Sequence, residues 1–183
     1  MVTMNDLERF NPITTFIFDV DGVLTNSQLL VMEDGSLLRH MNVRDGYAIR
    51  RAIEKGYKVA IITGGKSEGV VTRLQNLGVV DLYYGIKDKV AAYREFMYLY
   101  EDEITYENVL FMGDDMVDLA VMKMVGLPAC PNDACPEILG VSKFVSQANG
   151  GAGAARDVIE RVLKLNGDWL PTAEEGEELP RSV

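Results

Sequence analysis

Short apolar runs rich in β-branched residues alternate along this chain with segments whose apolar residues recur at helical spacing. The short runs predict strands at residues 14–20, 58–63, 79–84, 109–112, 127–130 and 144–145. The helical spacing predicts helices at residues 45–55, 67–78, 88–100, 116–125 and 154–165. Strands that alternate with helices in this way are typical of an α/β fold with a doubly wound parallel sheet.

One segment, residues 28–42, departs from this alternation. Asp34-Gly35 supplies a turn between two apolar arms, which predicts a β-hairpin inserted into the domain. Apolar side chains fall on both faces of this ribbon: Leu29, Leu30, Val31, Met32, Leu37, Leu38 and Met41. An isolated hairpin is only marginally stable in water, and exposed apolar faces invite association. We therefore expect the hairpin to pack against another copy of the chain.

Length and composition fit a single globular domain: the chain has 183 residues, of which 48% are hydrophobic and 25% are charged. We expect the domain to span residues 1–170, with an acidic, flexible tail at 171–183. No apolar run approaches the roughly 18 residues of a membrane span, and the polar residues 1–11 lack an export signal. These features predict a cytoplasmic protein with no membrane partner.

Charge and cysteine content exclude two further classes of function. The formal net charge of -10 argues against a nucleic-acid partner, because phosphate backbones bind positively charged surfaces. Cys130 and Cys135 have no second cysteine pair and no histidine nearby, so we expect two reduced thiols and no zinc site. The single histidine, His40, is expected to have a structural or surface role.

Polar residues gather where four of the predicted strands end. In open parallel sheets the carboxyl ends of the strands meet at one edge, so we expect these side chains to converge there. The residues concerned are Asp19 and Asp21, then Thr63 to Lys66, then Lys87 and Lys89, and finally Gly113, Asp114, Asp115 and Asp118.

This group of residues has the chemistry of phosphoryl transfer. Several carboxylates at one edge repel each other unless a cation lies among them, and oxygen ligands without histidine or cysteine favour Mg²⁺. The Thr63 hydroxyl, the Gly64 backbone and the Lys89 ammonium group suit a tetrahedral anion, with Lys87 as the competing lysine. Asp19 is then a candidate nucleophile that forms an aspartyl-phosphate, and Asp21 a candidate acid and base.

A calcium-binding EF-hand loop can also begin with D-x-D-G. That loop would need a further ligand at Val23 and a glutamate at the position of Leu30. Neither residue offers a side-chain oxygen, so the EF-hand interpretation fails.

The order D-x-D-G, T-G, lysine, G-D-D, each at a predicted strand end, resembles the phosphatases of the haloacid dehalogenase (HAD) superfamily across residues 14–165. The resemblance implies that Asp19 is the nucleophile and Asp21 the acid and base. It also implies that Thr63, Gly64 and Lys89 bind the transferring phosphoryl group.

The same resemblance implies a magnesium site. Asp19, Asp114 and the backbone carbonyl of Asp21 are the ligands that it implies. Asp115 and Asp118 are expected to support the metal site without binding the ion directly.

Further segments are similar to one capless subfamily, the phosphatases of 3-deoxy-D-manno-octulosonate 8-phosphate (KDO 8-phosphate). They are DVDGVLTN at 19–26, NVRDG at 42–46, AIITG at 60–64, GDD at 113–115 followed by M-x-x-V-G at 122–126, and NGGAGAARDVIE at 149–160. The resemblance implies hydrolysis of KDO 8-phosphate for lipopolysaccharide synthesis. It also implies no large cap domain and a homotetramer in which a neighbouring subunit covers each active site.

One departure from the subfamily bears on the substrate. Many such enzymes read T-G-R-x-S, whereas Gly65 and Lys66 follow Thr63-Gly64 here. Lys66 does not replace the planar fork of an arginine. Arg44, which matches the family, is the candidate to hold the sugar end, and Arg156 is a candidate contact across a subunit interface. Lys66 is retained as a third substrate-binding candidate.

Three alternatives therefore stay open. The first is a phosphatase of another 2-keto sugar acid phosphate, such as a nine-carbon, sialic-acid-type compound. The others are a non-catalytic regulatory module and a receiver-like phosphoacceptor. The intact Asp19, Asp21 and Asp114 argue against a non-catalytic module, and the second loop carboxylate, Asp21, favours a hydrolase over a receiver.

Overall fold

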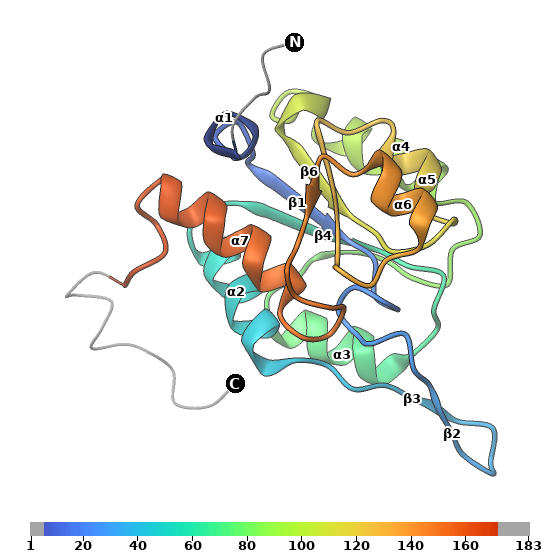
Figure 1. Cartoon of the computed structure of the whole chain (residues 1–183). Coiled ribbons are helices and arrows are strands. Elements are labelled where there is room, and N and C mark those ends of the chain that lie inside the picture. Colours follow the sequence, from blue (N-terminus) through green and yellow to red (C-terminus); the bar gives the residue numbers. More distant parts are fainter. Residues whose placement is uncertain (1–5, 172–183) are drawn as a thin grey trace.

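A central parallel sheet with helices on both faces makes up the part of the chain described by the computed structural model, residues 6–171 (Figure 1). The sheet has the order β5-β4-β1-β6-β7-β8. Its strands are β1 (Thr15–Phe18), β4 (Lys58–Ile62), β5 (Asp81–Tyr83), β6 (Val109–Met112), β7 (Leu127–Cys130) and β8 (Phe144–Val145). From β1 the chain adds β4 and β5 on one side, and it then returns to add β6, β7 and β8 on the other side of β1. This order confirms the predicted doubly wound α/β fold, and residues 6–171 contain no large cap domain.

Two layers of helices cover the sheet, and a short α1 (Asp6–Phe10) lies against α7. One layer holds α2 (Val43–Glu54), α3 (Glu68–Asn76) and α7 (Ala154–Leu165). The other holds α4 (Lys89–Leu99), α5 (Leu119–Met122) and α6 (Pro136–Val141). A 3₁₀ turn, η1 (Tyr106–Asn108), precedes β6. None of the helices in residues 6–171 has the length and apolar character needed to cross a bilayer.

Strand β1 explains why the core has two halves. Phe16 and Phe18 are fully buried against the layer of α2, α3 and α7, whereas Ile17 is fully buried on the side of α4, α5 and α6. Successive side chains of a strand point to opposite faces, so a continuous apolar run is needed where both faces are covered. The central strand is therefore held from both sides, which fixes the position of the residue that follows it.

Several element boundaries differ from the predictions. β1 ends at Phe18 because the carbonyl of Val20 accepts the backbone N–H groups of Val23, Leu24 and Thr25, which closes a tight loop. The predicted helix at 116–125 was too long, since only Leu119–Met122 is helical. Residues 116–118 form a turn before it, and residues 123–124 form a turn after it. Helices α1 and α6 were not predicted, because their apolar patterns are too short to show a period.

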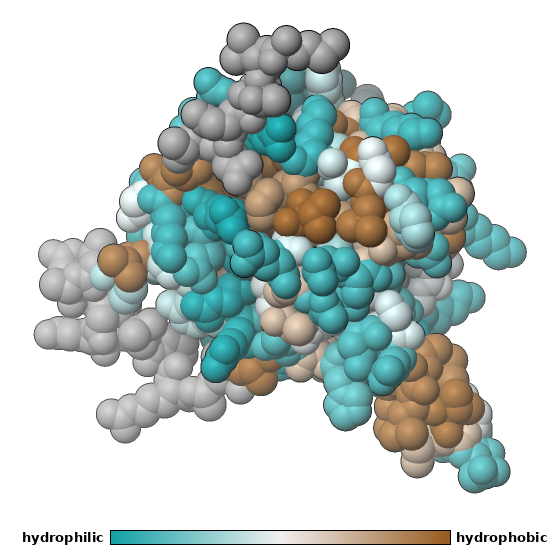
Figure 2. Space-filling view, viewed as in Figure 1, coloured by the Kyte–Doolittle hydropathy of each residue, from teal (hydrophilic) through white to brown (hydrophobic). Residues whose placement is uncertain are grey.

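The predicted hairpin is present as β2 (Leu30–Val31) and β3 (Leu37–Leu38), paired antiparallel. It projects away from the body of the domain (Figure 1) and carries an apolar patch at its surface (Figure 2). The apolar patch consists of Leu29, Leu30, Val31, Met32, Leu37 and Leu38, all of which are exposed. Met41, expected on the same ribbon, instead packs against the core of the domain.

Two other predictions concern the thiols and the tail. Cys130 and Cys135 are both free thiols, and Cys130 is buried. Of the predicted acidic tail at 171–183, all but Pro171 lies outside the described residues.

Candidate active site

The carboxyl ends of β1, β4 and β6 open onto one cavity of about 550 Å³. Seven of the residues predicted from the sequence line it: Asp19, Asp21, Thr63, Gly64, Lys89, Asp114 and Asp115. The remaining lining residues are Ser27, Leu29, Gly65, Ile86, Lys87 and Val117. The fold thus brings together side chains that are separated by up to 96 positions in the sequence, as the rule for parallel sheets predicts.

Asp19 is the first residue after β1, and its position is fixed by the sheet. Its backbone N–H donates to the carbonyl of Met112 on β6, at 3.1 Å. The residue is only 4% exposed, and its Oδ1 is buried without a hydrogen-bond partner in the protein. Burial, with repulsion from Asp118, raises the pKa of Asp19 to about 6, while Lys89 opposes the shift. The oxygen without a partner is available to a ligand.

Lys89 forms ion pairs with both Asp19 and Asp118. Its Nζ lies 2.9 Å from Asp19 Oδ2 and 2.7 Å from Asp118 Oδ1. Burial alone would lower the pKa of Lys89, but the two carboxylates outweigh it and raise that pKa. Lys89 opens α4, which Asp88 caps by accepting the N–H of Ala91 at 3.0 Å. Lys87, the competing candidate, is an exposed residue of the cavity wall.

Asp118 is fully buried and shapes the G-D-D turn. Its Oδ2 accepts the backbone N–H groups of Asp114, at 3.2 Å, and Asp115, at 3.4 Å. Because Oδ1 already accepts from Lys89, both oxygens of Asp118 are engaged within the protein. Asp115 is exposed, and its Oδ1 accepts the N–H of Met116 at 2.8 Å. These contacts fit the supporting roles predicted for Asp115 and Asp118.

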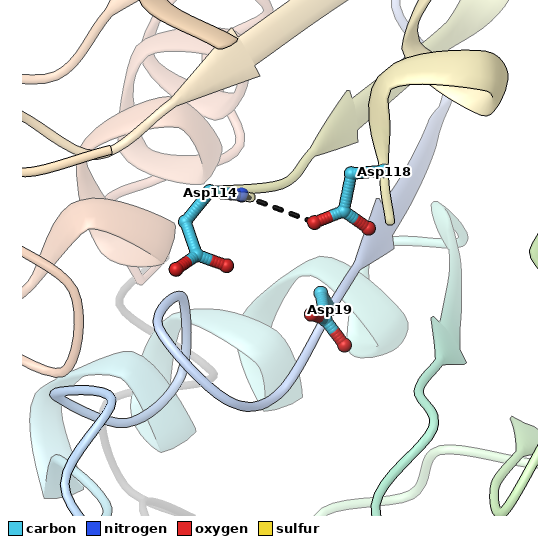
Figure 3. Close-up of side chains that lie close together, drawn as sticks. All are labelled: Asp19, Asp114 and Asp118. Atoms are coloured by element: carbon cyan, nitrogen blue, oxygen red, sulfur yellow. Dashed lines mark hydrogen bonds between the residues drawn. The ribbon is translucent and has the colours of Figure 1, made fainter. Parts of the chain in front are cut away.

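Three carboxylates form a cluster that suits a divalent cation. One oxygen each from Asp19, Asp114 and Asp118 lies within 4.8 Å of the others. The close-up shows the three side chains gathered at the ends of their strands and loops (Figure 3). Burial, followed by repulsion from Asp19 and Asp118, raises the pKa of Asp114 to about 7. Asp114 Oδ1, like Asp19 Oδ1, is buried without a protein partner. A hard cation bound by oxygen satisfies both oxygens and removes the repulsion, so the residues present fit such an ion.

Gly22 of the D-x-D-G motif lies against this cluster. Its φ is 92°, a left-handed conformation that favours glycine. Ser27, from the same loop, donates its hydroxyl to Asp114 Oδ2 at 3.4 Å. The loop after β1 therefore contacts the loop after β6 through both backbone and side chain.

The T-G segment after β4 also lines the cavity and offers donors to it. Thr63 is buried, and its Oγ1 accepts the backbone N–H of Gly65 at 3.2 Å. The hydroxyl proton of Thr63 is left free to donate to an anion. Strand pairing fixes this segment, since Thr63 N–H donates to the carbonyl of Tyr83 at 2.8 Å.

One residue of this region, Arg39, was missed by the sequence analysis. Its Nε lies 2.6 Å from Asp21 Oδ1 and its Nη2 lies 3.0 Å from Asp21 Oδ2. Arg39 follows β3, so the hairpin carries it to Asp21 in the cavity wall. The pattern of residues 28–42 predicted only an apolar hairpin. A single basic residue in that hairpin does not indicate an ion pair with a carboxylate 18 positions away.

The three predicted substrate-binding residues lie outside the cavity of this chain. Lys66 is exposed, with its side chain against Gly85. Arg44 and Arg156 line a separate hollow beside α7. Arg156 is paired with Glu160 at 2.8 Å. Contact of these residues with a substrate would require a neighbouring subunit or a conformational change, and their roles stay predictions.

Comparison with known proteins identifies the family, although no protein-family model matches the chain. The chain is 40% identical over 166 residues to the KDO 8-phosphate phosphatase KdsC of Salmonella typhimurium, which covers 91% of this chain and 87% of the relative. The chain belongs to the KDO 8-phosphate phosphatase family. It is thus a phosphatase, and the resemblance predicted from its motifs is confirmed.

Solved structures of this and related families have the same fold. The KDO 8-phosphate phosphatase of Moraxella catarrhalis, in complex with magnesium, phosphate and KDO, matches with a TM-score of 0.83 and 28% identity, covering 89% of this chain and 92% of the other. A HAD superfamily (subfamily III A) hydrolase structure from Legionella pneumophila matches with a TM-score of 0.85 and 30% identity, covering 89% and 88%. These matches place the KDO 8-phosphate phosphatase family within the HAD superfamily.

Proposed function

We propose that this chain hydrolyses KDO 8-phosphate to KDO and inorganic phosphate, with Asp19 as a covalent nucleophile and Mg²⁺ as cofactor. The observation that carries the proposal is the state of Asp19: its Oδ2 is held by Lys89 and its Oδ1 has no partner. Curated relatives carry this activity in their names, and the Moraxella catarrhalis structure contains magnesium, phosphate and KDO.

The first chemical step follows from these contacts. Asp19 Oδ1 attacks phosphorus, a bond forms between them, and the bond from phosphorus to the sugar oxygen breaks. Asp21 gives its proton to the leaving oxygen. Thr63 and Lys89 bind the phosphoryl oxygens, because a hydroxyl and a fixed ammonium group suit a tetrahedral dianion. The products of this step are KDO and an aspartyl-phosphate.

The second step releases phosphate. Asp21, now a carboxylate, takes a proton from a water molecule, whose oxygen attacks phosphorus. The bond between phosphorus and Asp19 Oδ1 breaks, and the carboxylate is restored. Magnesium, when bound, would supply positive charge that offsets the carboxylates and the phosphoryl group. Asp19 and Asp114 are the side chains that would hold it.

A second candidate substrate is a nine-carbon 2-keto acid phosphate of the sialic-acid type. It is favoured by one feature of the sequence, the glycine at position 65, where the T-G-R-x-S pattern of the subfamily that the chain resembles has arginine. The chemistry at Asp19 would be the same. The sugar end alone distinguishes the two compounds.

We also propose that the chain works as a homo-oligomer, with four subunits as the expected state. Leu29 supports this because it belongs to the exposed apolar patch of the hairpin and also lines the cavity. A neighbouring subunit that covers the patch would exclude water from the aspartyl-phosphate.

The function is tested by measuring phosphate release from a panel of sugar phosphates, with Mg²⁺ and with a chelator. We expect KDO 8-phosphate to be the best substrate and the reaction to require the metal. Asp19→Asn should lose at least about a thousandfold in kcat, as expected when a covalent nucleophile is removed. Asp102→Asn, a change in an exposed carboxylate outside the cavity, is the matched control. Full activity of Asp19→Asn would show that another group attacks phosphorus.

A further inference from the structure

Arg39 is a partly buried residue at the edge of the active site. Its side chain is only 6% exposed, although it comes from a hairpin whose apolar residues are exposed. A third contact, from Nη1 to the carbonyl of Leu37 at 3.3 Å, helps to fix the guanidinium plane. Long charged side chains are seldom buried unless they are paired, so the position of Arg39 is a specific feature of the site.

The guanidinium occupies the space beside the glycine that departs from the subfamily pattern. A Cβ built on Gly65 would lie 3.4 Å from Arg39 Nη2 and 3.2 Å from Asp21 Oδ2. A side chain at position 65 would therefore start next to the place where Arg39 ends. The guanidinium of Arg39, which comes from the hairpin, therefore lies next to the position where the side chain of the arginine in a T-G-R-x-S segment would begin.

The contact with Asp21 is not compatible with the reaction. Arg39 donates to both carboxylate oxygens of Asp21, the two atoms from which a proton would pass to a leaving group. The guanidinium must move before Asp21 can give a proton to the sugar oxygen. A competing anion is the ligand that would draw it away, because an arginine fork pairs with any carboxylate through two parallel hydrogen bonds.

The substrate brings two anionic groups, and one of them already has its donors. Thr63 and Lys89 lie beside Asp19, where the phosphoryl group is expected. The sugar carboxylate has no arginine assigned to it, since Arg44 and Arg156 line a separate hollow. Lys87 lines the cavity as an exposed ammonium group, which lacks the planar fork that pairs with a carboxylate through two hydrogen bonds. Among the described residues, Arg39 lies next to the cavity wall, because it is paired with Asp21 and lies beside Gly65, and both of these line the cavity.

We propose that Arg39 binds the carboxylate of the sugar acid phosphate, and that this binding releases Asp21 for proton transfer. The inference rests on the proposed function, because it assumes a substrate with a carboxylate group. Arg39 then determines specificity. A substrate with a carboxylate draws Arg39 away from Asp21, whereas a phosphate ester without a carboxylate leaves Arg39 and Asp21 paired.

The test compares two classes of substrate in the magnesium-loaded protein. Arg39→Ala should lower kcat/KM for the best carboxylated sugar phosphate of the panel by tenfold or more, mainly through KM. With p-nitrophenyl phosphate, which has no carboxylate, kcat/KM should stay within threefold or rise. Arg39→Lys should retain part of the effect, because it keeps the charge and loses the fork. Arg94→Ala, a change in an exposed arginine on α4, is the control.

A rescue experiment uses the neighbouring position. In the Arg39→Ala background, Gly65→Arg should recover at least threefold of the loss on the carboxylated substrate, because the two side chains would occupy adjoining space. Thermal melting of each variant shows whether the fold is kept. An equal loss on both substrates, or no loss on either, would overturn the assignment.

A binding measurement separates this inference from the proposed substrate. Free KDO has the carboxylate and no phosphate, and its affinity can be measured by calorimetry without any turnover. Arg39→Ala should weaken KDO binding by tenfold or more. If the wild-type chain prefers another carboxylated sugar phosphate, the proposed substrate is wrong, and the comparison is made with that compound and its dephosphorylated product. Unchanged affinity in Arg39→Ala would refute the role of Arg39.

Discussion

The carboxylate of Asp114 lies so close to the backbone of Gly22 that a Cβ at Gly22 would sit 1.8 Å from Asp114 Oδ2. Gly22→Ala should therefore displace Asp114 and weaken metal binding. We expect phosphatase activity to fall at least about a hundredfold, with a higher magnesium concentration needed for half-maximal activity. A magnesium titration of phosphate release measures both effects.

Gly167→Ala is the matched control for this change. Gly167 also has a positive φ, of 78°, but no atom lies within 4 Å of its Cβ position. The left-handed strain, about 1 kcal/mol, should lower stability in both variants. Only Gly22→Ala should change the magnesium requirement, and an equal change in both variants would refute the steric argument.

Asp114→Asn should lower phosphatase activity, and in the absence of metal it should raise the stability of the folded chain. The pKa of Asp114 is raised to about 7, first by burial and then by Asp19 and Asp118. Its ionisation therefore destabilises the folded chain as pH rises from about 4 towards 7. We expect Asp114→Asn to melt above the wild type in EDTA at pH 8, by about 2–4 °C for each kcal/mol gained. Magnesium should stabilise the wild type and not the variant, and an equal magnesium shift in both would contradict the ligand role.

Lys89 and Lys87 are distinguished by removing each charge. Lys89→Met leaves Asp19 and Asp118 buried without their shared cation, which typically costs about 3–5 kcal/mol. We expect a lower free energy of unfolding in urea and a loss of activity of at least about a hundredfold. Lys87→Met changes an exposed side chain, so its effect on activity should stay within about tenfold. The reverse ranking would exchange the roles of the two lysines.

Asp45 should make stability depend on pH in a way that is independent of the active site. The residue is 2% exposed and accepts the backbone N–H of Arg156 at the start of α7, at 2.8 Å. Burial raises the pKa of Asp45 to about 6, although the N–H groups of Arg156 and Gly153 oppose it. The folded chain therefore holds this proton more tightly than the unfolded chain. The stabilisation is complete below about pH 4 and is lost as pH rises through 6.

Asp45→Asn removes this titration and keeps an acceptor for Arg156. The stability of the variant relative to the wild type should increase between pH 4 and pH 7, by on the order of 2 kcal/mol. Urea unfolding of both chains at pH 4.5 and pH 7.5 measures the difference. Asp102→Asn serves as the control, and a difference that does not change with pH would rule out Asp45 as its source.

The apolar patch of the hairpin predicts how assembly is disrupted. Replacing Leu30 and Leu38 by aspartate places two charges where we expect a subunit interface. Light scattering should then report smaller particles, because charges are excluded from the centre of such interfaces. Val80→Asp, at a residue that is 82% exposed outside the hairpin, should leave the assembly intact. Monomers in the wild type would show that the hairpin needs no partner subunit.

The sequence predicts the sheet and the gathering of polar residues well because both follow from local rules. The continuous apolar run at Phe16 to Phe18 requires burial on both faces, so the strand is evident without any knowledge of its neighbours. Asp19, Thr63 and Asp114 then converge because strands that run parallel end at the same edge.

What the sequence could not predict depends on contacts between distant residues. The helix expected at 116–125 is shortened because the Asp118 carboxylate binds the backbone of Asp114 and Asp115. The ion pair of Arg39 with Asp21 depends on the direction in which the hairpin leaves the domain. Arg156 is held at α7 by Asp45, and no periodic pattern records that contact across 111 positions.

Leu29 has a further consequence, since it belongs at once to the projecting hairpin and to the wall of the cavity. Any subunit that docks on the hairpin also alters the entrance used by the substrate. Turnover per polypeptide should consequently fall when the enzyme is diluted far enough for its subunits to separate. Catalytic competence would then be a property of the assembled particle, and cellular abundance would set how much of the pool is active.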